Sequence, residues 1–129
     1  MSSSDALTTF DRATHLTTLH QAWDHVLDRA SAPGIDRLSV QDFAANAAQR
    51  LERLAAALRK LHWRPRPARR VVLPDDPDRP IAVPTVRDRI VQRALALALG
   101  ARYEPTLDAA AHAYRPGRGV HTALRAVER

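Results

Sequence analysis

The sequence predicts an α+β fold that is mostly helical, with amphipathic helices and one short antiparallel β-hairpin. Apolar residues recur at helical spacing over three stretches, and two short strand-like runs flank an acidic connection that contains proline. Hydrophobic residues make up 45% of the 129 residues, which excludes general disorder. A chain of this length forms one domain or part of one.

The N-terminal segment predicts a tail, a helix and a turn. Residues 1–10 are polar and are expected to form a disordered tail. From Leu16, apolar residues recur at helical spacing, so we expect a helix that ends near Ala30. Its apolar positions are Leu19, Trp23, Val26 and Leu27. A turn should follow, because Pro33 fixes φ and Gly34 can adopt the left-handed region.

A second helix is predicted from Ser39 to Trp63. Ser39 and Asp42 have the spacing of a capping box, with Asp where Glu is commoner. One apolar stripe continues from there, formed by Val40, Phe43, Ala47, Leu51, Leu54, Leu58 and Leu61. The pattern stops before Pro65. Residues 11–63 are therefore expected to form an N-terminal helical extension.

The remaining elements are a hairpin and two helices. Residues 69–73 and 79–83 predict strands joined by 74–78. Thr85 and Asp88 repeat the capping-box spacing and open a third helix that ends before Pro105. Residues 113–119 predict a loop, and a further amphipathic helix should begin at Val120.

The charge indicates an anionic partner. The net charge is +6, the isoelectric point is near 11.1, and nineteen of the twenty basic residues are arginine. Arginine forms forked contacts to phosphate that lysine cannot form. A GC-rich coding sequence would also raise the arginine content, so the positions of the arginines must support the inference.

Three groups of arginines stand out. One is Arg87, Arg89 and Arg93 on the predicted third helix, where Arg89 and Arg93 are four residues apart and share a face. Arg69, Arg70 and Arg79 open the two predicted strands, where they could reach one polyphosphate or nucleic-acid backbone; alternatively, they protect a solvated hairpin edge from aggregation. Arg115 and Arg118 flank the turn at Pro116-Gly117 and can converge on one anion.

The sequence predicts no catalytic residue and no metal site. It contains no cysteine, no nucleophile elbow and no Tyr-x-Asp-Asp, and its histidines lack metal-ligand spacing. Asp75 and Asp76 lie in a proline-rich turn rather than on a rigid frame, so we expect no two-metal centre there. We also expect no signal peptide and no membrane span, and hence a cytoplasmic protein.

In chain order, six motifs resemble group II intron-type reverse transcriptases, which are RNA-directed DNA polymerases. They are Ala32-Pro-Gly-Ile-Asp36, His62-Trp-Arg-Pro-Arg-Pro67, Arg79-Pro-Ile-Ala-Val-Pro84, the helix start Thr85–Gln92, Tyr103-Glu-Pro105 and Ala113-Tyr-Arg-Pro-Gly-Arg118. The resemblance covers roughly residues 20–129. It implies that the chain contains the family's N-terminal extension and part of the fingers of a right-hand polymerase, over residues 64–129, with the palm absent.

The resemblance also implies roles for individual residues. Arg79 would contact the incoming triphosphate, Val83 would pack on the new base pair, and Arg69 would lie along the template. Asp75 departs from the pattern, because the family usually has Lys there and a carboxylate repels a triphosphate. The family's first catalytic aspartate lies beyond the helix that starts at Val120, so Mg²⁺ is expected only in a complete polymerase.

These observations lead to one main functional expectation and two alternatives. The chain is expected to be the N-terminal and fingers fragment of a reverse transcriptase, which binds RNA template, RNA/DNA duplex and incoming deoxynucleotide but is catalytically incomplete alone. A palm-bearing chain is then a candidate partner. The alternatives are a stand-alone RNA-binding module that helps an intron RNA fold, and a degenerate remnant that folds poorly.

Overall fold

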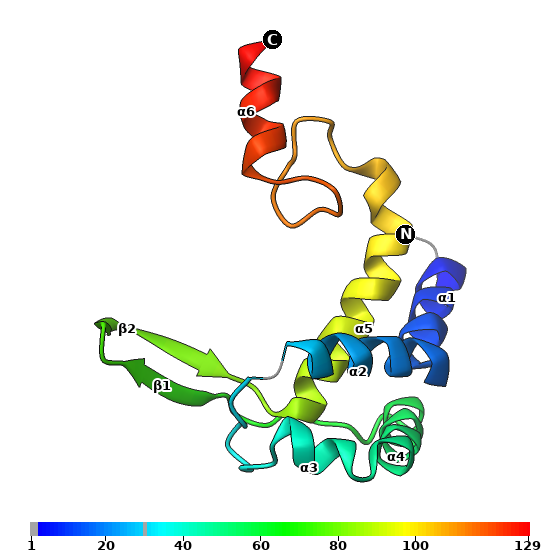
Figure 1. Cartoon of the computed structure of the whole chain (residues 1–129). Coiled ribbons are helices and arrows are strands. Elements are labelled where there is room, and N and C mark those ends of the chain that lie inside the picture. The colour runs from blue at the N-terminus through cyan, green and yellow to red at the C-terminus, as the bar shows by residue number, and fades with distance from the viewer. Residues whose placement is uncertain (1–2, 30) are drawn as a thin grey trace. The chain divides into compact units, whose positions relative to one another are not determined.

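The computed structural model describes residues 3–29 and 31–129 and confirms an α+β fold with one antiparallel hairpin (Figure 1). Its helices are α1 (Ser3–Thr14), α2 (Leu16–Asp28), α3 (Val40–Ala44), α4 (Ala47–Arg59), α5 (Val86–Tyr103) and α6 (Val120–Glu128), with a 3-10 turn η1 (Glu104–Thr106). The strands are β1 (Arg69–Leu73) and β2 (Asp76–Val83). The chain divides into two compact units, residues 1–98 and 99–129.

The N-terminal segment differs from the expected tail. Residues 3–10 belong to α1, so the prediction of a disordered tail over residues 1–10 was wrong there, while residues 1 and 2 lie outside the described residues. Ala13 and Thr14 are buried, and the Thr14 hydroxyl donates a hydrogen bond to the Phe10 carbonyl at 2.9 Å. The polar sequence of α1 does not predict a helix, because tertiary packing of its C-terminal end stabilises it.

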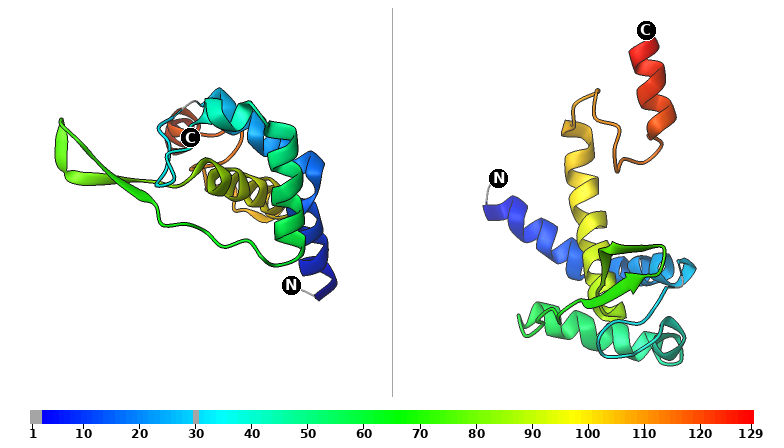
Figure 2. Two further views of the ribbon diagram at one scale, coloured as in Figure 1. Left: turned by 90° about the horizontal axis from the view of Figure 1, so that it is seen from below. Right: turned by 90° about the vertical axis from the view of Figure 1, so that its left-hand side faces the viewer.

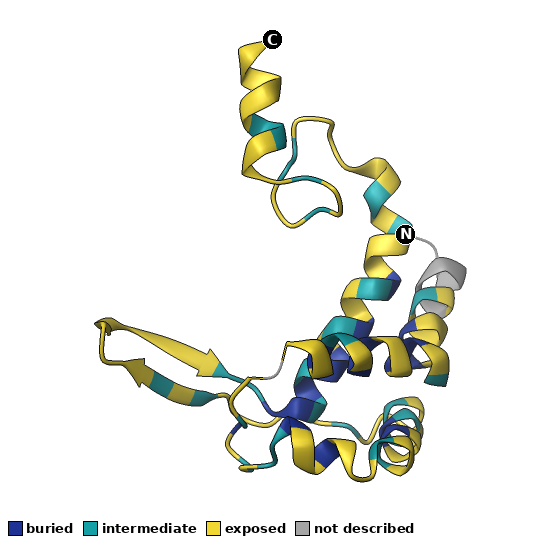
Figure 3. Cartoon of the chain, in the orientation of Figure 1, coloured by how far each residue is buried: buried dark blue, intermediate teal, exposed yellow. Residues whose placement is uncertain are grey.

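Four helices of the first unit share one hydrophobic core. Its buried members are Leu19, Ala22, Trp23 and Val26 of α2, Val40 and Phe43 of α3, Leu51 and Leu54 of α4, and Val86, Ile90, Val91 and Ala94 of α5. The rings of Trp23 and Phe43 pack with centroids 4.7 Å apart. The views in Figures 2 and 3 show these helices gathered around the buried start of α5. The expected boundary between an N-terminal extension and a fingers part, after Trp63, falls inside this first unit.

The segment predicted as one helix from Ser39 to Trp63 forms two helices, so the single helix was wrong. Its capping box is confirmed: the Asp42 N–H donates to Ser39 Oγ and the Ser39 N–H donates to Asp42 Oδ2, each at 3.0 Å. The chain leaves helical geometry at Asn46, where φ is −136° and ψ is 36°. The break lets Phe43 pack on α2 while α4 buries its own leucines in the same core.

The turn after α2 approaches α5 closely. A Cβ on Gly34 would lie 2.6 Å from Thr85 Cα and 2.7 Å from Thr85 N, so a side chain does not fit there. Gly34 is therefore needed for space rather than for a left-handed backbone. The residue with positive φ in this turn is Arg37, at 59°.

The hairpin has a tighter turn than predicted. β2 starts at Asp76 instead of residue 79, and Arg69 pairs with Val83 while Arg70 pairs with Ala82. The register shifts between Val71 and Leu73, opposite the stretch 77–80 of β2, whose two prolines have no N–H to donate. Most of the hairpin is exposed, and it projects from the helical core (Figures 1 and 3).

The second unit contains the end of α5, η1, the loop that follows and α6. His112 Nδ1 lies 2.9 Å from the Thr122 hydroxyl, which ties the loop to the first turn of α6. The predicted helix after Val120 is confirmed. Its apolar residues Val120, Leu124 and Val127 are exposed.

Candidate nucleic-acid interface

A buried carboxylate connects the start of the hairpin to α5. Asp88 is only 2% exposed; its Oδ1 accepts a hydrogen bond from Trp63 Nε1 at 3.2 Å, and its Oδ2 accepts one from the Arg66 backbone N–H at 2.8 Å. Thr85 Oγ1 accepts from the Asp88 N–H at 3.1 Å, so the N-cap half of the expected capping box is present. The Asp88 carboxylate positions the segment that leads into β1.

Arginines from two elements hold the turn after α2. Arg69 Nε donates to the Pro33 carbonyl at 3.1 Å. Arg89 donates through Nη2 to the Ala32 carbonyl at 2.8 Å and through Nη1 to Ser31 Oγ. Burial lowers the pKa of Arg89. Arg69 therefore fixes this turn, and its two terminal nitrogens make no hydrogen bond within the described residues.

The strand pairing separates the hairpin arginines. Side chains alternate along a strand and paired residues share a face, so Arg69 and Val83 lie on one face and Arg70 lies on the other. Arg79 lies in the stretch of β2 between Asp76 and Ile81, where the register shifts. Arg79 lies four residues before Val83, the pairing partner of Arg69. Four strand residues span about 13 Å. Arg70 and Arg79 are exposed, and neither side chain has a partner among the described residues. Arg79 and Val83 share β2, whereas Arg70 lies on β1 and faces away from Val83.

The two arginines beside Pro116-Gly117 converge on their own loop. Arg115 Nε donates to Glu104 Oε1 at 3.0 Å, and its Nη1 donates to the carbonyls of Asp108 and Ala111 at 2.8 and 2.7 Å. Arg118 Nη1 donates to the Ala109 carbonyl at 2.6 Å. The side chain of Arg115 is 8% exposed. Both residues stabilise this loop, and a role in nucleic-acid binding stays a prediction.

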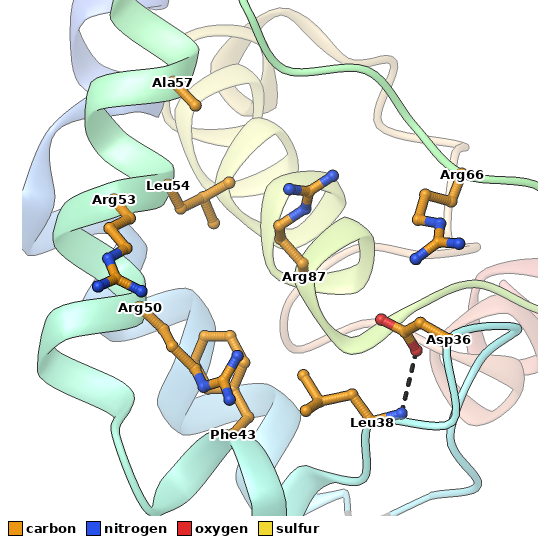
Figure 4. A pocket seen from close by; sticks show the side chains of 9 residues that line it. All are labelled: Asp36, Leu38, Phe43, Arg50, Arg53, Leu54, Ala57, Arg66 and Arg87. Carbon is orange, nitrogen blue, oxygen red and sulfur yellow. Dashed lines mark hydrogen bonds between the residues drawn. The ribbon is translucent and has the colours of Figure 1, made fainter.

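A cavity of about 430 Å³ gathers four arginines, of which the sequence singled out only Arg87 (Figure 4). Its charged lining residues are Arg50 and Arg53 of α4, Arg66 before β1, Arg87 in the first turn of α5, and Asp36. The spacing of Arg50 and Arg53 places them near each other on α4, and this signal could have been found in the sequence. Their proximity to Arg66 and Arg87 depends on the tertiary structure.

The charges of this cavity are largely uncompensated. The Arg50 guanidinium carbon lies 5.8 Å from the centre of the Phe43 ring, and Arg50 Nε is buried without a hydrogen-bond partner. Arg87 Nη2 donates to the Arg64 carbonyl at 3.4 Å. Asp36 Oδ1 accepts from the Leu38 N–H at 3.1 Å. No arginine of the cavity forms a salt bridge within the described part of the chain.

A second basic cavity lies between α2 and α5 and has a volume of about 350 Å³. Burial lowers the pKa of His25 in its lining, and the guanidinium groups of Arg93 and Arg29 lower it further. In the part of the chain that the structure describes, no three His, Cys, Asp or Glu side chains cluster so that they could hold a metal ion. Among residues 3–29 and 31–129, no helix has both the length and the apolar character that a membrane span requires.

Comparison with known proteins identifies partial relatives, two of them linked to introns by name. No family model matches the sequence. The chain is 38% identical over 101 residues to protein YkfC of Escherichia coli, an alignment that covers 77% of this chain and 26% of YkfC. It is 30% identical over 84 residues to group II intron-encoded protein LtrA of Lactococcus lactis, covering 63% of this chain and 14% of LtrA. An uncharacterized 91 kDa protein in the cob intron of Schizosaccharomyces pombe is 33% identical over 79 residues, which is 60% of this chain and 10% of that protein.

These alignments confirm the resemblance stated from the sequence motifs. The chain is a partial homologue of group II intron-type reverse transcriptases. It spans about a quarter of YkfC and a smaller share of the intron proteins.

Proposed function

We propose that this chain is the N-terminal extension and fingers part of an RNA-directed DNA polymerase, and that it binds RNA template and the incoming deoxynucleoside triphosphate. The observation that carries the proposal is the exposed, unpaired Arg79 on the strand that also carries the half-buried Val83, in a chain related to intron-encoded proteins. An unpaired guanidinium and an apolar side chain about 13 Å apart along one strand suit an extended ligand with both phosphates and a base.

Each candidate residue has a distinct task in this proposal. Arg79 would neutralise charge on the triphosphate, and Val83 would pack against the base pair. Arg69 and Arg70, on opposite hairpin faces, would contact the nucleic-acid backbone. Arg115 and Arg118 would add backbone contacts through the nitrogens that their own loop does not use.

Catalysis would need groups from outside the described residues. Nucleotidyl transfer by two metal ions requires a cluster of carboxylates, and the described residues provide none. We therefore assign no metal ligand to this chain and expect Mg²⁺ in a complete polymerase. An RNA/DNA duplex and a palm-bearing chain would be its partners there.

Nucleotide binding is the sharpest test of the proposal. The wild-type chain, Arg79→Gln and the matched control Arg59→Gln on α4 would be titrated with a deoxynucleoside triphosphate, with melting temperature as the readout. We expect the nucleotide to raise the melting temperature of the wild type and of the control. The affinity of Arg79→Gln for the nucleotide should be at least about tenfold weaker, since a charge-assisted hydrogen bond contributes roughly 1.5–3 kcal/mol. If the nucleotide raises the melting temperature of none of the three proteins, the chain does not bind it.

The alternative is a stand-alone RNA-binding module, which the uncompensated arginines also favour. Such a module binds RNA without any effect of nucleotide. Its affinity should fall with salt, with a log–log slope of about −0.7 for each single-strand phosphate contacted. RNA binding without nucleotide binding would favour this alternative.

A further inference from the structure

We propose that the cavity lined by Arg50, Arg53, Arg66 and Arg87 is a binding site for the phosphate backbone of RNA. Neither Arg79 nor Val83 of the hairpin lines this cavity. The inference rests on the proposed function for the identity of the ligand, which is RNA. The contacts and charges of the cavity itself supply the chemistry.

The charge balance of the cavity favours an anion. Four guanidinium groups line it, and Asp36 is its only carboxylate. Asp36 already accepts a hydrogen bond from the Leu38 N–H, and none of the four arginines forms a salt bridge within the described residues. Like charges held together repel, and a bound phosphate group removes that repulsion through charge-assisted hydrogen bonds.

One arginine of the cavity is both fixed and incompletely satisfied. Arg50 lies with its guanidinium over the Phe43 ring, and its buried Nε has no hydrogen-bond partner. A buried donor without an acceptor costs free energy, and phosphate oxygen is a strong acceptor. The cation–π contact holds the guanidinium at the cavity wall, as Figure 4 shows.

The backbone that carries the other arginines is also held in place. The Arg66 N–H donates to the buried Asp88 carboxylate, and Arg87 follows directly after the first residue of α5. Arg87 Nη2 further donates to the Arg64 carbonyl. The cavity is therefore assembled by the same hydrogen bonds that position the hairpin, and it does not require folding around its ligand.

The shape and lining favour a phosphate backbone over a base. A volume of about 430 Å³ lies within the size range of ligand sites. Phe43 is the only aromatic residue of the lining, and it is 2% exposed, so no free ring face remains for stacking. Contacts to phosphate without base stacking bind nucleic acid independently of its sequence.

The experiment compares two double variants that remove equal charge. Arg53→Gln with Arg87→Gln alters the cavity, whereas Arg12→Gln with Arg59→Gln removes two exposed arginines of the same unit outside it. Binding of a single-stranded RNA would be measured over a series of salt concentrations, after melting curves confirm that both proteins fold. The single variant Arg53→Gln replaces the cavity double if that protein does not fold.

We expect the cavity variant to lose affinity and to reduce the magnitude of the salt slope by about 1.4, which corresponds to two phosphate contacts. The control should change the slope by much less. Equal slopes for the two variants, with RNA binding intact in the wild type, would overturn the cavity site and leave the proposed function standing. A wild type that binds no RNA would overturn both.

A second measurement separates RNA from free phosphate compounds. Inorganic pyrophosphate would be added to the wild type and the cavity variant, with melting temperature as the readout. Stabilisation of the wild type alone, together with a changed RNA slope, supports the RNA-backbone site. Stabilisation by pyrophosphate with an unchanged RNA slope would instead assign the cavity to a free polyphosphate and overturn the inference.

Discussion

The carboxylate of Asp88 accepts a hydrogen bond from the indole of Trp63, at 3.2 Å and across twenty-five residues of sequence. Its second oxygen accepts from the Arg66 N–H at 2.8 Å. One buried side chain in the first turn of α5 thus fixes the path of the chain into β1. The orientation of both the hairpin and the arginine cavity depends on this contact.

Replacing Asp88 by Ala should destabilise the protein by about 2–3 kcal/mol, because two donors lose a charged acceptor. Chemical denaturation would measure the loss. Asp88→Asn is the control, since it keeps one acceptor oxygen and should cost less. In a Trp23→Phe background, Trp63 fluorescence should shift to the red in the Ala variant. An unchanged free energy of unfolding in Asp88→Ala would show that the contact does not hold the segment.

Gly34→Ala should destabilise the first unit by about 1–3 kcal/mol, because overpacking forces the backbone to move. The added Cβ would meet backbone atoms of Thr85 and Pro84 at 2.6–2.9 Å. Gly100→Ala is the matched control: its Cβ meets nothing within 4 Å, and removing a helical glycine should stabilise by about 0.5–1 kcal/mol. The melting temperatures of the two variants should shift in opposite directions. An unchanged melting temperature of Gly34→Ala would contradict the close approach of Gly34 to Thr85.

Asp75→Lys should strengthen triphosphate binding if the hairpin holds nucleotide. The substitution replaces an exposed carboxylate at the hairpin turn by the residue type that the resemblance implies there. An exposed charge contributes on the order of 1 kcal/mol at low salt, so we expect about a fivefold gain that weakens as salt is added. Asp11→Lys on α1 gives the same charge change elsewhere and should have little effect. Equal gains in both variants would indicate non-specific attraction.

The capping box at Ser39 predicts a pH dependence of stability. The hydrogen bond from the Ser39 backbone N–H lowers the pKa of Asp42, and the Ser39 side chain lowers it further. Because the folded pKa is below the unfolded value of 3.8, this contribution is present above pH 3.8 and is lost as the pH falls through the folded pKa. Asp42→Asn should therefore be less stable than the wild type at pH 6, with a difference that shrinks at acid pH. A difference that stays constant would contradict this origin.

Several local features were predictable because they depend on neighbouring residues. The capping box at Ser39, the N-cap at Thr85 and the hairpin between β1 and β2 follow from short-range hydrogen bonding and strand propensity. The motifs also predicted the relationship to group II intron-type reverse transcriptases. Each of these signals lies within a few residues of sequence or in a linear motif.

Other features were hidden because their partners are distant in sequence. The break at Asn46 carries no glycine or proline, and packing of Phe43 on Trp23 accompanies it. Asp88 has the spacing of a capping residue, yet its carboxylate binds the chain before β1. Arg115 flanks a turn suited to an anion, but its guanidinium donates hydrogen bonds to carbonyls of its own loop.

The sequence by itself determined the helical character of the chain, its hairpin, its positive charge and its relatives, because periodicity, composition and motifs are properties of the linear chain. Only the tertiary structure decided which arginines are engaged and which are available. Arg69 donates a hydrogen bond to the Pro33 carbonyl, whereas Arg53 and Arg87 line the same cavity. A guanidinium has the same sequence signal in both situations, and what it binds depends on which backbone the fold brings to it.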